Sequence, residues 1–269
     1  MAEERPKIIL VIAGFDPSGG AGILADTKTI GAFGCYGAVA ITSLTLQNTQ
    51  GVFGAYNQTA EAVLGQLRPL FDDFDVSAVK TGMLPSLEVI RAVAETISSK
   101  AIPHVVVDPV VRSTSGFDLI DDVALRELIR SLFPLASVVT PNVAEVERIT
   151  GIRIKGRDDM EKAGRSILDL GPPAVLVKGG DMTSDTATDL LVDSEGAIPF
   201  VSERVFSRNT HGTGCTLASA LACLLARGKT LREAVPIAKR YLVDAIRTAP
   251  GLGKGHGPLN HFPPGFKVE

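Results

Sequence analysis

The sequence predicts an α/β fold with a mostly parallel central sheet. Short apolar runs alternate with longer segments of helical periodicity, and this alternation is typical of βαβ units. The first run, Ile8–Ala13, has no polar residue, as expected for a strand that is covered on both faces. We therefore expect a single domain over 1–269, with a core at 7–250 and a Pro/Gly-rich surface segment at 251–269.

Each expected strand is separated from the next by one helical crossover, which favours a doubly wound topology. The expected strands are Ile8–Ala13, Ala38–Thr42, Ala78–Lys80, His104–Asp108, Ser137–Thr140 and Ala174–Lys178, with a late antiparallel pair at Thr188–Val192 and Ile198–Val201. The expected helices are Ile23–Phe33, Thr59–Phe71, Ser86–Ser99, Asp122–Phe133, Val143–Thr150, Met160–Leu170, Thr216–Ala226 and Leu231–Thr248.

Composition excludes several classes of protein. The 27 basic and 30 acidic residues give a net charge of −3 with no basic arm, so neither nucleic acid nor an anionic membrane is an expected partner. The three cysteines have no metal-like spacing, which indicates a reducing compartment. The run Ile8–Ala13 is too short for a secretion signal or a membrane span, and we expect a cytoplasmic protein.

The loop after the first expected strand, Gly14–Gly22, is rich in small residues. Ligands of open parallel sheets bind beyond the carboxyl ends of the strands, and small residues let the backbone approach them closely. This loop also leads into a helix N-terminus, which favours anions. It is neither a Walker loop nor a spaced G-x-G-x-x-G, so a flexible glycine turn is an equal interpretation.

A second glycine-rich turn, Asn209–Cys215 (NTHGTGC), precedes an apolar helix. Gly212 and Gly214 leave N–H groups accessible at the helix start, where the helix dipole favours the charge of a transferring phosphoryl group. Cys215 lies in the same field, so we expect its pKa to be lowered. The competing interpretation is a helix cap followed by a small buried cysteine.

Further polar residues follow expected strands. Asp108 ends one strand, and Asn142 ends another with Glu145 three residues later on the same helix face, where both oxygens suit a metal or its waters. Asn142 is also a good helix N-cap. Lys178 precedes two glycines and suits a phosphate tail, although a solvated lysine at a turn fits the same pattern.

The motifs AGFDPSGGAG, ADTKT, LTLQNT, KTGML, DPV, TPNVAE, VKGG and NTHGTGCT occur in this order over nearly the whole chain. In this order they resemble the hydroxymethylpyrimidine/phosphomethylpyrimidine kinases of thiamine biosynthesis, within the ribokinase-like superfamily. The resemblance implies a three-layer α/β/α sandwich and a single kinase domain that uses ATP and Mg²⁺. It also implies two successive phosphorylations of one small substrate, and a homodimer.

The resemblance also assigns roles to residues. Cys215 matches the position of the superfamily's catalytic aspartate, and Gly212, Thr213 and Gly214 match its anion hole. Gln47 matches the residue that recognises the pyrimidine ring, since a carboxamide offers both donors and an acceptor. The other expected substrate contacts are Asp26, Gly14, Met83 and Val110. The expected nucleotide contacts are Lys178, Asn142, Thr210 and His211, and the expected metal ligands are Glu145 and Asn142.

Two positions depart from the family pattern. Asp181 stands where relatives often have histidine, and Phe15 replaces a smaller polar residue, which makes the pocket rim more apolar. Three alternatives stay open at this point. Asp108 competes with Cys215 as the base, pyridoxal competes with the pyrimidine as the substrate, and a catalytically inactive sensor competes with an enzyme.

Overall fold

The computed structural model describes residues 5–112, 116, 118–180 and 185–268. Within these residues the strands form one sheet in the order β3-β2-β1-β4-β5-β6-β7-β8-β9. The strands are β1 (Ile8–Phe15), β2 (Tyr36–Asn48), β3 (Gly51–Asn57), β4 (Val76–Thr81), β5 (Val105–Val107), β6 (Val138–Val139), β7 (Ala174–Val177), β8 (Thr186–Asp193) and β9 (Gly196–Glu203). Strands β2, β1, β4, β5, β6 and β7 run parallel, whereas β3 and β8 are antiparallel to their neighbours.

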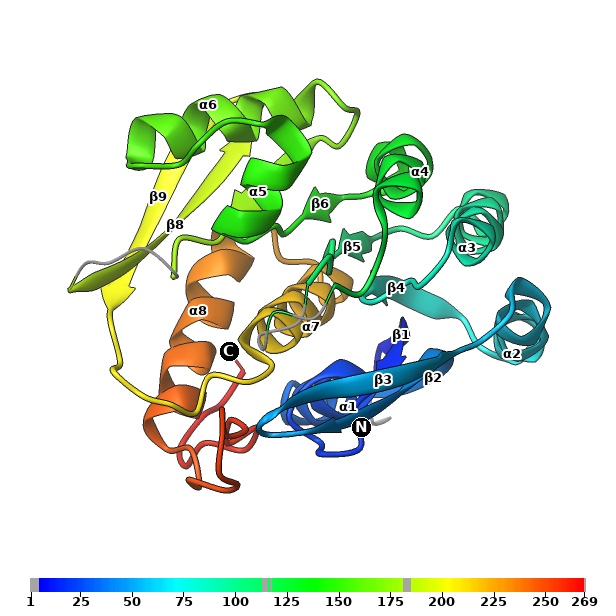
Figure 1. Cartoon of the computed structure of the whole chain (residues 1–269), viewed down its shortest axis with the longest axis horizontal. Coiled ribbons are helices and arrows are strands. Elements are labelled where there is room, and N and C mark those ends of the chain that lie inside the picture. The colour runs from blue at the N-terminus through cyan, green and yellow to red at the C-terminus, as the bar shows by residue number, and fades with distance from the viewer. Residues whose placement is uncertain (1–4, 113–115, 117, 181–184, 269) are drawn as a thin grey trace.

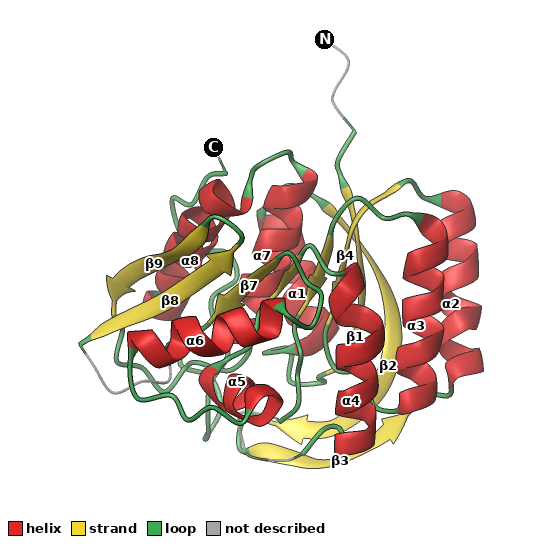
Figure 2. Ribbon diagram, turned by 90° about the horizontal axis from the view of Figure 1, so that it is seen from above, coloured by secondary structure: helices red, strands yellow, loops and turns green. Residues whose placement is uncertain are grey.

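Helices cover both faces of this sheet, which makes three layers (Figure 1). The helices are α1 (Gly22–Ala32), α2 (Ala60–Asp73), α3 (Leu87–Lys100), α4 (Asp122–Leu132), α5 (Val143–Thr150), α6 (Arg157–Leu168), α7 (Thr213–Ala226) and α8 (Leu231–Arg247). Helices α1, α7 and α8 pack on one face, and α2, α3, α4 and α6 pack on the other. Figure 2 shows α2, α3 and α4 side by side. No helix in the described part of the chain is both long enough and apolar enough to cross a membrane.

The apolar first strand explains why two cores form. Successive side chains of a strand point to opposite faces, so Ile9 and Val11 pack against α1 and α7 while Leu10 and Ile12 pack against the α2–α4 face. All four side chains are fully buried. The prediction of a mostly parallel sheet that is covered on both faces is therefore confirmed.

Strand β2 is much longer than the expected Ala38–Thr42, and its partner β3 was not predicted. The segment from Ser43 to Gln47 alternates polar and apolar residues, which is the pattern of a half-buried strand. Here the polar residues Ser43 and Thr45 face inward, and Leu44 and Leu46 are exposed. An apolar outer face with a polar inner face is the reverse of the usual arrangement, so hydrophobic periodicity did not reveal this hairpin.

Two further corrections bear on the site. Helix α7 begins at Thr213 instead of Thr216, so Gly214 and Cys215 belong to its first turn. The segment 251–269 is not confined to the surface, because the side chains of Leu259 and His261 are buried. This segment also hydrogen bonds to the glycine-rich turn, where the backbone N–H of His211 donates to the carbonyl of Gly257 at 3.1 Å.

Candidate active site

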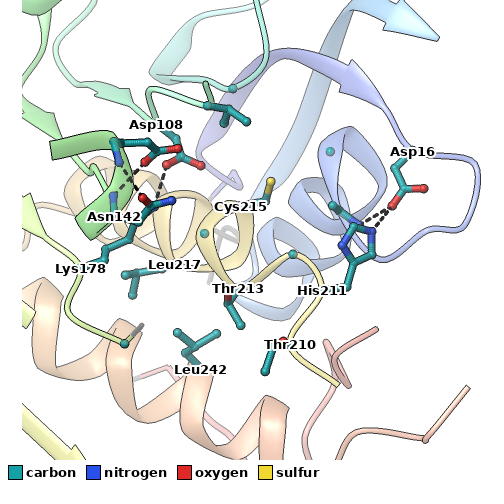
Figure 3. A pocket seen from close by; sticks show the side chains of 18 of the residues that line it. Asp16, Asp108, Asn142, Lys178, Thr210, His211, Thr213, Cys215, Leu217 and Leu242 are labelled. Carbon is teal, nitrogen blue, oxygen red and sulfur yellow. Dashed lines mark hydrogen bonds and ion pairs between the residues drawn. The ribbon is translucent and has the colours of Figure 1, made fainter. Parts of the chain in front are cut away.

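A cavity of about 720 Å³ lies at the carboxyl ends of the parallel strands, next to the N-terminus of α7. With one exception, Asp26, every site residue predicted from the sequence lines it. These residues are Gly14, Gln47, Met83, Asp108, Val110, Asn142, Glu145, Lys178, Thr210, His211, Gly212, Thr213, Gly214 and Cys215. Figure 3 shows Asp108, Asn142 and Lys178 on one side of the cavity, Asp16 and His211 on the other, and Cys215 with Thr213 between them.

The turn before α7 is built to leave N–H groups open to the cavity. Gly212 has φ +85°, a conformation that favours glycine, and a side chain there would strike the carbonyl of Gly20. None of the described side chains caps α7. The Thr213 N–H donates to the Thr210 carbonyl at 3.3 Å, whereas Gly214 and Cys215 line the cavity, which meets the positive end of the helix dipole here. An anion at this turn is therefore stabilised by the backbone.

Lys178 brings a positive charge to the same place. Its Nζ lies 2.9 Å from Asp108 Oδ1, which also accepts a hydrogen bond from Thr140 Oγ1 at 3.2 Å. Burial lowers the pKa of Lys178, but the charges of Asp108 and Glu145 outweigh that effect and raise it. A Cβ at Gly214 would lie only 3.1 Å from Lys178 Nζ, so glycine lets the ammonium group approach the helix start.

Asn142 and Glu145 form a reciprocal capping box at the start of α5. Asn142 Oδ1 accepts from the Glu145 N–H at 2.9 Å, and Glu145 Oε2 accepts from the Asn142 N–H at 2.8 Å. Burial raises the pKa of Glu145 to about 7, against the opposing effect of the Lys178 charge. The predicted N-cap role of Asn142 is confirmed.

The prediction that Cys215 has a lowered pKa is wrong. Burial raises the pKa of the Cys215 thiol to about 11, and the charge of Lys80 only partly opposes this effect. The helix dipole is present, as the sequence indicated, but the loss of hydration destabilises a thiolate more than one helix terminus stabilises it. The resting cysteine is therefore a neutral thiol at pH 7.

The other end of the cavity holds Gln47 and the predicted apolar walls. A Cβ at Gly14 would lie 3.1 Å from the sulfur of Met83, so these two residues form a narrow wall, and Phe15 and Val110 also line the cavity. The apolar rim expected from Phe15 is thus part of the cavity, whereas Asp181 lies outside the described residues.

His211 belongs to this end as well. The sequence placed it among the expected nucleotide contacts, but its side chain points toward Asp16 and Gln47. The imidazole Nε2 lies 2.7 Å from Asp16 Oδ2 and 3.1 Å from Gln47 Nε2. Thr210, the preceding residue, points away from this group (Figure 3). Sequence reasoning did not assign a role to Asp16, although it lies in the AGFDPSGGAG motif that was singled out.

Comparison with known proteins now identifies the family. A family model described as phosphomethylpyrimidine kinase matches residues 16–260. The chain belongs to the phosphomethylpyrimidine kinase family. Because this is a family of phosphotransferases, the prediction that the chain is a kinase is confirmed.

Two relatives and two solved structures support this assignment. The chain is 48% identical over 254 residues to the thiamine biosynthesis bifunctional protein ThiED of Geobacter sulfurreducens, covering 94% of this chain and 52% of that relative, or about half its length. It is 44% identical over 256 residues to the hydroxymethylpyrimidine/phosphomethylpyrimidine kinase of Streptomyces coelicolor, covering 95% and 94%. Phosphomethylpyrimidine kinase from Clostridium difficile superposes with a TM-score of 0.79 at 42% identity, covering 89% and 99% of the two chains. Pyridoxal kinase from Staphylococcus aureus, solved with pyridoxal, gives 0.90 at 31% identity, covering 97% and 95%. The ribokinase-like fold is confirmed.

Asp26 is the predicted residue that this phosphomethylpyrimidine kinase family member does not bring to the cavity. Its carboxylate is fully buried, 2.8 Å from Lys80 Nζ, and it accepts a hydrogen bond from Ser219 Oγ at 2.7 Å. Ser219 lies one turn after Cys215 on α7, so this carboxylate lies behind the first turn of α7, whereas its partner Lys80 lines the cavity. The contact between Asp26 and substrate has no support in this geometry.

Sequence reasoning missed the apolar residues at the end of the cavity opposite to Gln47. They come from α7 and α8 and are Leu217, Leu242, Val243 and Ile246. In the sequence they form part of ordinary amphipathic helices, so nothing separates them from core residues. Only the packing of α8 beside α7 shows that this stripe borders a cavity (Figure 1).

Proposed function

We propose that this enzyme phosphorylates 4-amino-5-hydroxymethyl-2-methylpyrimidine with ATP, first to the monophosphate and then to the diphosphate. The observation that carries the proposal is the order of groups along one cavity. An amide, Gln47, lies at one end, and an apolar stripe lies at the other. The helix start with Lys178 lies between them, where two substrates placed end to end would exchange a phosphoryl group.

The nucleotide end is proposed from its chemistry. A flat apolar base suits the slot beside Leu217 and Leu242, and Lys178 meets the phosphates with its charge. Thr210 also lines the cavity, on the other side of Leu242 from Lys178 (Figure 3). Solved pyridoxal kinases of similar fold have been crystallised with ADP and with AMP-PCP, which supports nucleotide binding in this cavity.

The residues present fit magnesium. Asp108, Asn142 and Glu145 supply oxygen donors beside the proposed phosphate position. Among the described residues no three acidic, histidine or cysteine side chains gather into a complete metal cage. This suits Mg²⁺, which keeps several waters and takes phosphate oxygens as ligands. Glu145 and Asn142 would hold the ion through water, and the bound ion would neutralise phosphate charge.

The proposed mechanism is in-line attack by the substrate hydroxymethyl oxygen on the γ-phosphorus of ATP. The backbone N–H groups of Gly214 and Cys215 and the Lys178 ammonium group stabilise the charge on the transferring group. The thiolate form of Cys215, a minor species at pH 7, accepts the hydroxyl proton, and Asp108 is the rival base because its Oδ2 also faces the start of α7.

We also propose a cytoplasmic homodimer. The exposed apolar residues Leu44 and Leu46 on the outer face of β2 are consistent with such an interface.

Gln47 tests the choice of substrate. Gln47→Ala should lower kcat/KM for hydroxymethylpyrimidine about ten- to hundredfold, because a buried hydrogen-bonding pair with the ring is lost. The loss for pyridoxal should be smaller. Steady-state kinetics of the wild type and of Gln47→Ala, each with hydroxymethylpyrimidine and with pyridoxal, measure these losses. The matched control is Gln58→Ala, since Gln58 does not line the cavity.

Pyridoxal kinase is the second candidate, because of the TM-score of 0.90 to a pyridoxal kinase solved with pyridoxal. Equal losses on both rings, or a wild type that prefers pyridoxal, would refute the pyrimidine assignment. A sensor is separated from both kinases by ADP release. An enzyme releases ADP faster when hydroxymethylpyrimidine is added, whereas a sensor releases none.

Lys178 and Glu145 test the phosphate end. Lys178→Ala should raise the KM for ATP about tenfold or more and the KM for the pyrimidine much less, because its charge meets the phosphates. Glu145→Gln should raise the Mg²⁺ concentration needed for half-maximal rate. Titrations of ATP and Mg²⁺ measure both effects, and Lys162→Ala on the exposed face of α6 is the control. Unchanged titrations would remove both residues from the site.

A further inference from the structure

The imidazole of His211 joins three parts of the cavity. It lies against Gly20 of the first loop, where no side chain would fit, and between Asp16 and Gln47. The side chain is buried, and so is that of Asp16. Its own backbone precedes Gly212 and the phosphate-binding turn. His211 therefore connects the residue expected to read the ring with the turn expected to bind phosphate.

Asp16 is an acceptor in every contact it makes. Its Oδ1 accepts from the Ser18 N–H at 2.8 Å, and its Oδ2 accepts from Ser18 Oγ and from the Ala21 N–H, each at 2.9 Å. A carboxylate surrounded by donors is ionised. The short contact of 2.7 Å to His211 Nε2 is then a hydrogen bond in which the imidazole donates.

This assignment creates a conflict at Gln47. Its Nε2, itself a donor, lies 3.1 Å from the same His211 Nε2–H. At the other end of the amide, Gln47 Oε1 and the Phe15 carbonyl both lie 3.0 Å from Thr45 Oγ1, but a hydroxyl has only one hydrogen to donate. One donor thus faces a donor, and two acceptors compete for one hydrogen.

Exchanging the amide oxygen and nitrogen removes both conflicts at once. The Gln47 oxygen then accepts from His211 Nε2–H, which it shares with Asp16. The Gln47 nitrogen donates to Thr45 Oγ1, which is free to donate to the Phe15 carbonyl. The two amide atoms have nearly the same shape, so the hydrogen-bond network decides the orientation.

We propose that Asp16 and His211 are positioning residues that lock the Gln47 amide in this orientation, and so set the order of donor and acceptor that the ring meets. The inference rests on the proposed function, in which Gln47 reads the ring. A locked amide pairs with an amino group beside a ring nitrogen in one placement only. It rejects a ring whose amino group is replaced by an oxo group, whereas a free amide would turn and accept it.

A double-mutant cycle tests the proposal. His211→Phe keeps the ring volume but removes both nitrogens, and it should lower kcat/KM for hydroxymethylpyrimidine about ten- to hundredfold. The KM for ATP should change less than about threefold, since His211 acts at the ring end. In the Gln47→Ala background the same substitution should cost less than about threefold, because there is no amide left to lock. His211→Phe should also narrow the preference for the 4-amino over the 4-oxo ring.

His104→Phe replaces a histidine that does not line the cavity and should leave all constants unchanged. Additive losses in the cycle, or a rise mainly in the KM for ATP, would overturn the lock. If Gln47→Ala alone has no effect on hydroxymethylpyrimidine, the proposed function fails instead. If His211→Phe does not fold, nitrogen NMR of the wild-type histidine rings decides, because an Nε2 of His211 without a proton contradicts the proposal.

Discussion

Cys215→Ala is expected to lower kcat about 100-fold or more, with little change in the KM for either substrate. The physical reason is the loss of a group that accepts the hydroxyl proton in the transition state. The effect belongs in kcat because the thiolate acts on the reacting hydroxyl and is not proposed to hold the ring or the nucleotide. Single-turnover measurements, with chemistry shown to be rate-limiting, provide the test.

The pH dependence of kcat then identifies the base. With a pKa of about 11, about one Cys215 thiol in ten thousand is ionised at pH 7. The thiolate fraction rises tenfold per pH unit below the pKa, so the wild-type kcat should rise with pH between about 7 and 9, and Cys215→Ala should lose this rise. Cys223→Ala, on the same helix but outside the cavity, is the matched control and should behave as wild type. A flat wild-type profile with near-normal kcat in Cys215→Ala would transfer the role to Asp108.

Lys80→Met is expected to destabilise the fold by about 3–5 kcal/mol, the cost of leaving one partner of a buried ion pair uncompensated. Lys80 and Asp26 are both fully shielded from solvent and lie 2.8 Å apart. Although burial lowers the pKa of Lys80, the charge of Asp26, its hydrogen bond and the other acidic groups nearby together outweigh burial and raise the pKa. Urea unfolding followed by circular dichroism measures the loss.

A double variant and an exposed ion pair show whether the loss of stability comes from the unpaired Asp26 charge. Adding Asp26→Asn to Lys80→Met removes the orphaned charge but keeps an acceptor for Ser219, so it should recover a large part of the loss. Arg165→Met breaks the exposed pair with Glu161 and should cost less than about 1 kcal/mol. A Lys80→Met variant as stable as Arg165→Met would show that the buried pair contributes nothing net.

Much of the site was predictable because of one topological rule. Asp108, Asn142 and Lys178 each follow a parallel strand, so their side chains converge although Asp108 and Lys178 are 70 positions apart in sequence. The rule needs only the strand ends, and those came from apolar runs that are buried on both faces. The rule did not predict that Thr45 and Gln47 lie within a strand, because the β2–β3 hairpin buries its polar side and so lacks the apolar inner face that marks a strand.

The sequence could not reveal how deeply a side chain is buried or in which direction it points. Asp26 and Cys215 lie in motifs that point to chemistry, but burial removes Asp26 from the cavity and raises the pKa of Cys215. His211 lies beside Thr210 and Gly212 in sequence, yet the left-handed conformation of Gly212 turns the chain so that the imidazole meets Asp16. Burial and side-chain direction depend on residues far away in the chain, and no local pattern records them.

The segment after α8 contacts both the β2–β3 hairpin and the turn before α7. Thr49, two residues beyond Gln47, accepts hydrogen bonds from the N–H groups of Lys254 and Gly255, each at 3.2 Å, and the Gly257 carbonyl holds the backbone of His211. These contacts come from residues that are synthesised after every other part of the cavity. A nascent chain that has released only its first 250 residues has both cores and the turn before α7 in its sequence, and Gln47 can already meet His211, but the backbone contacts from 254–257 are missing. We therefore expect the β2–β3 hairpin and the turn before α7 to reach their final arrangement last, once this segment has emerged from the ribosome.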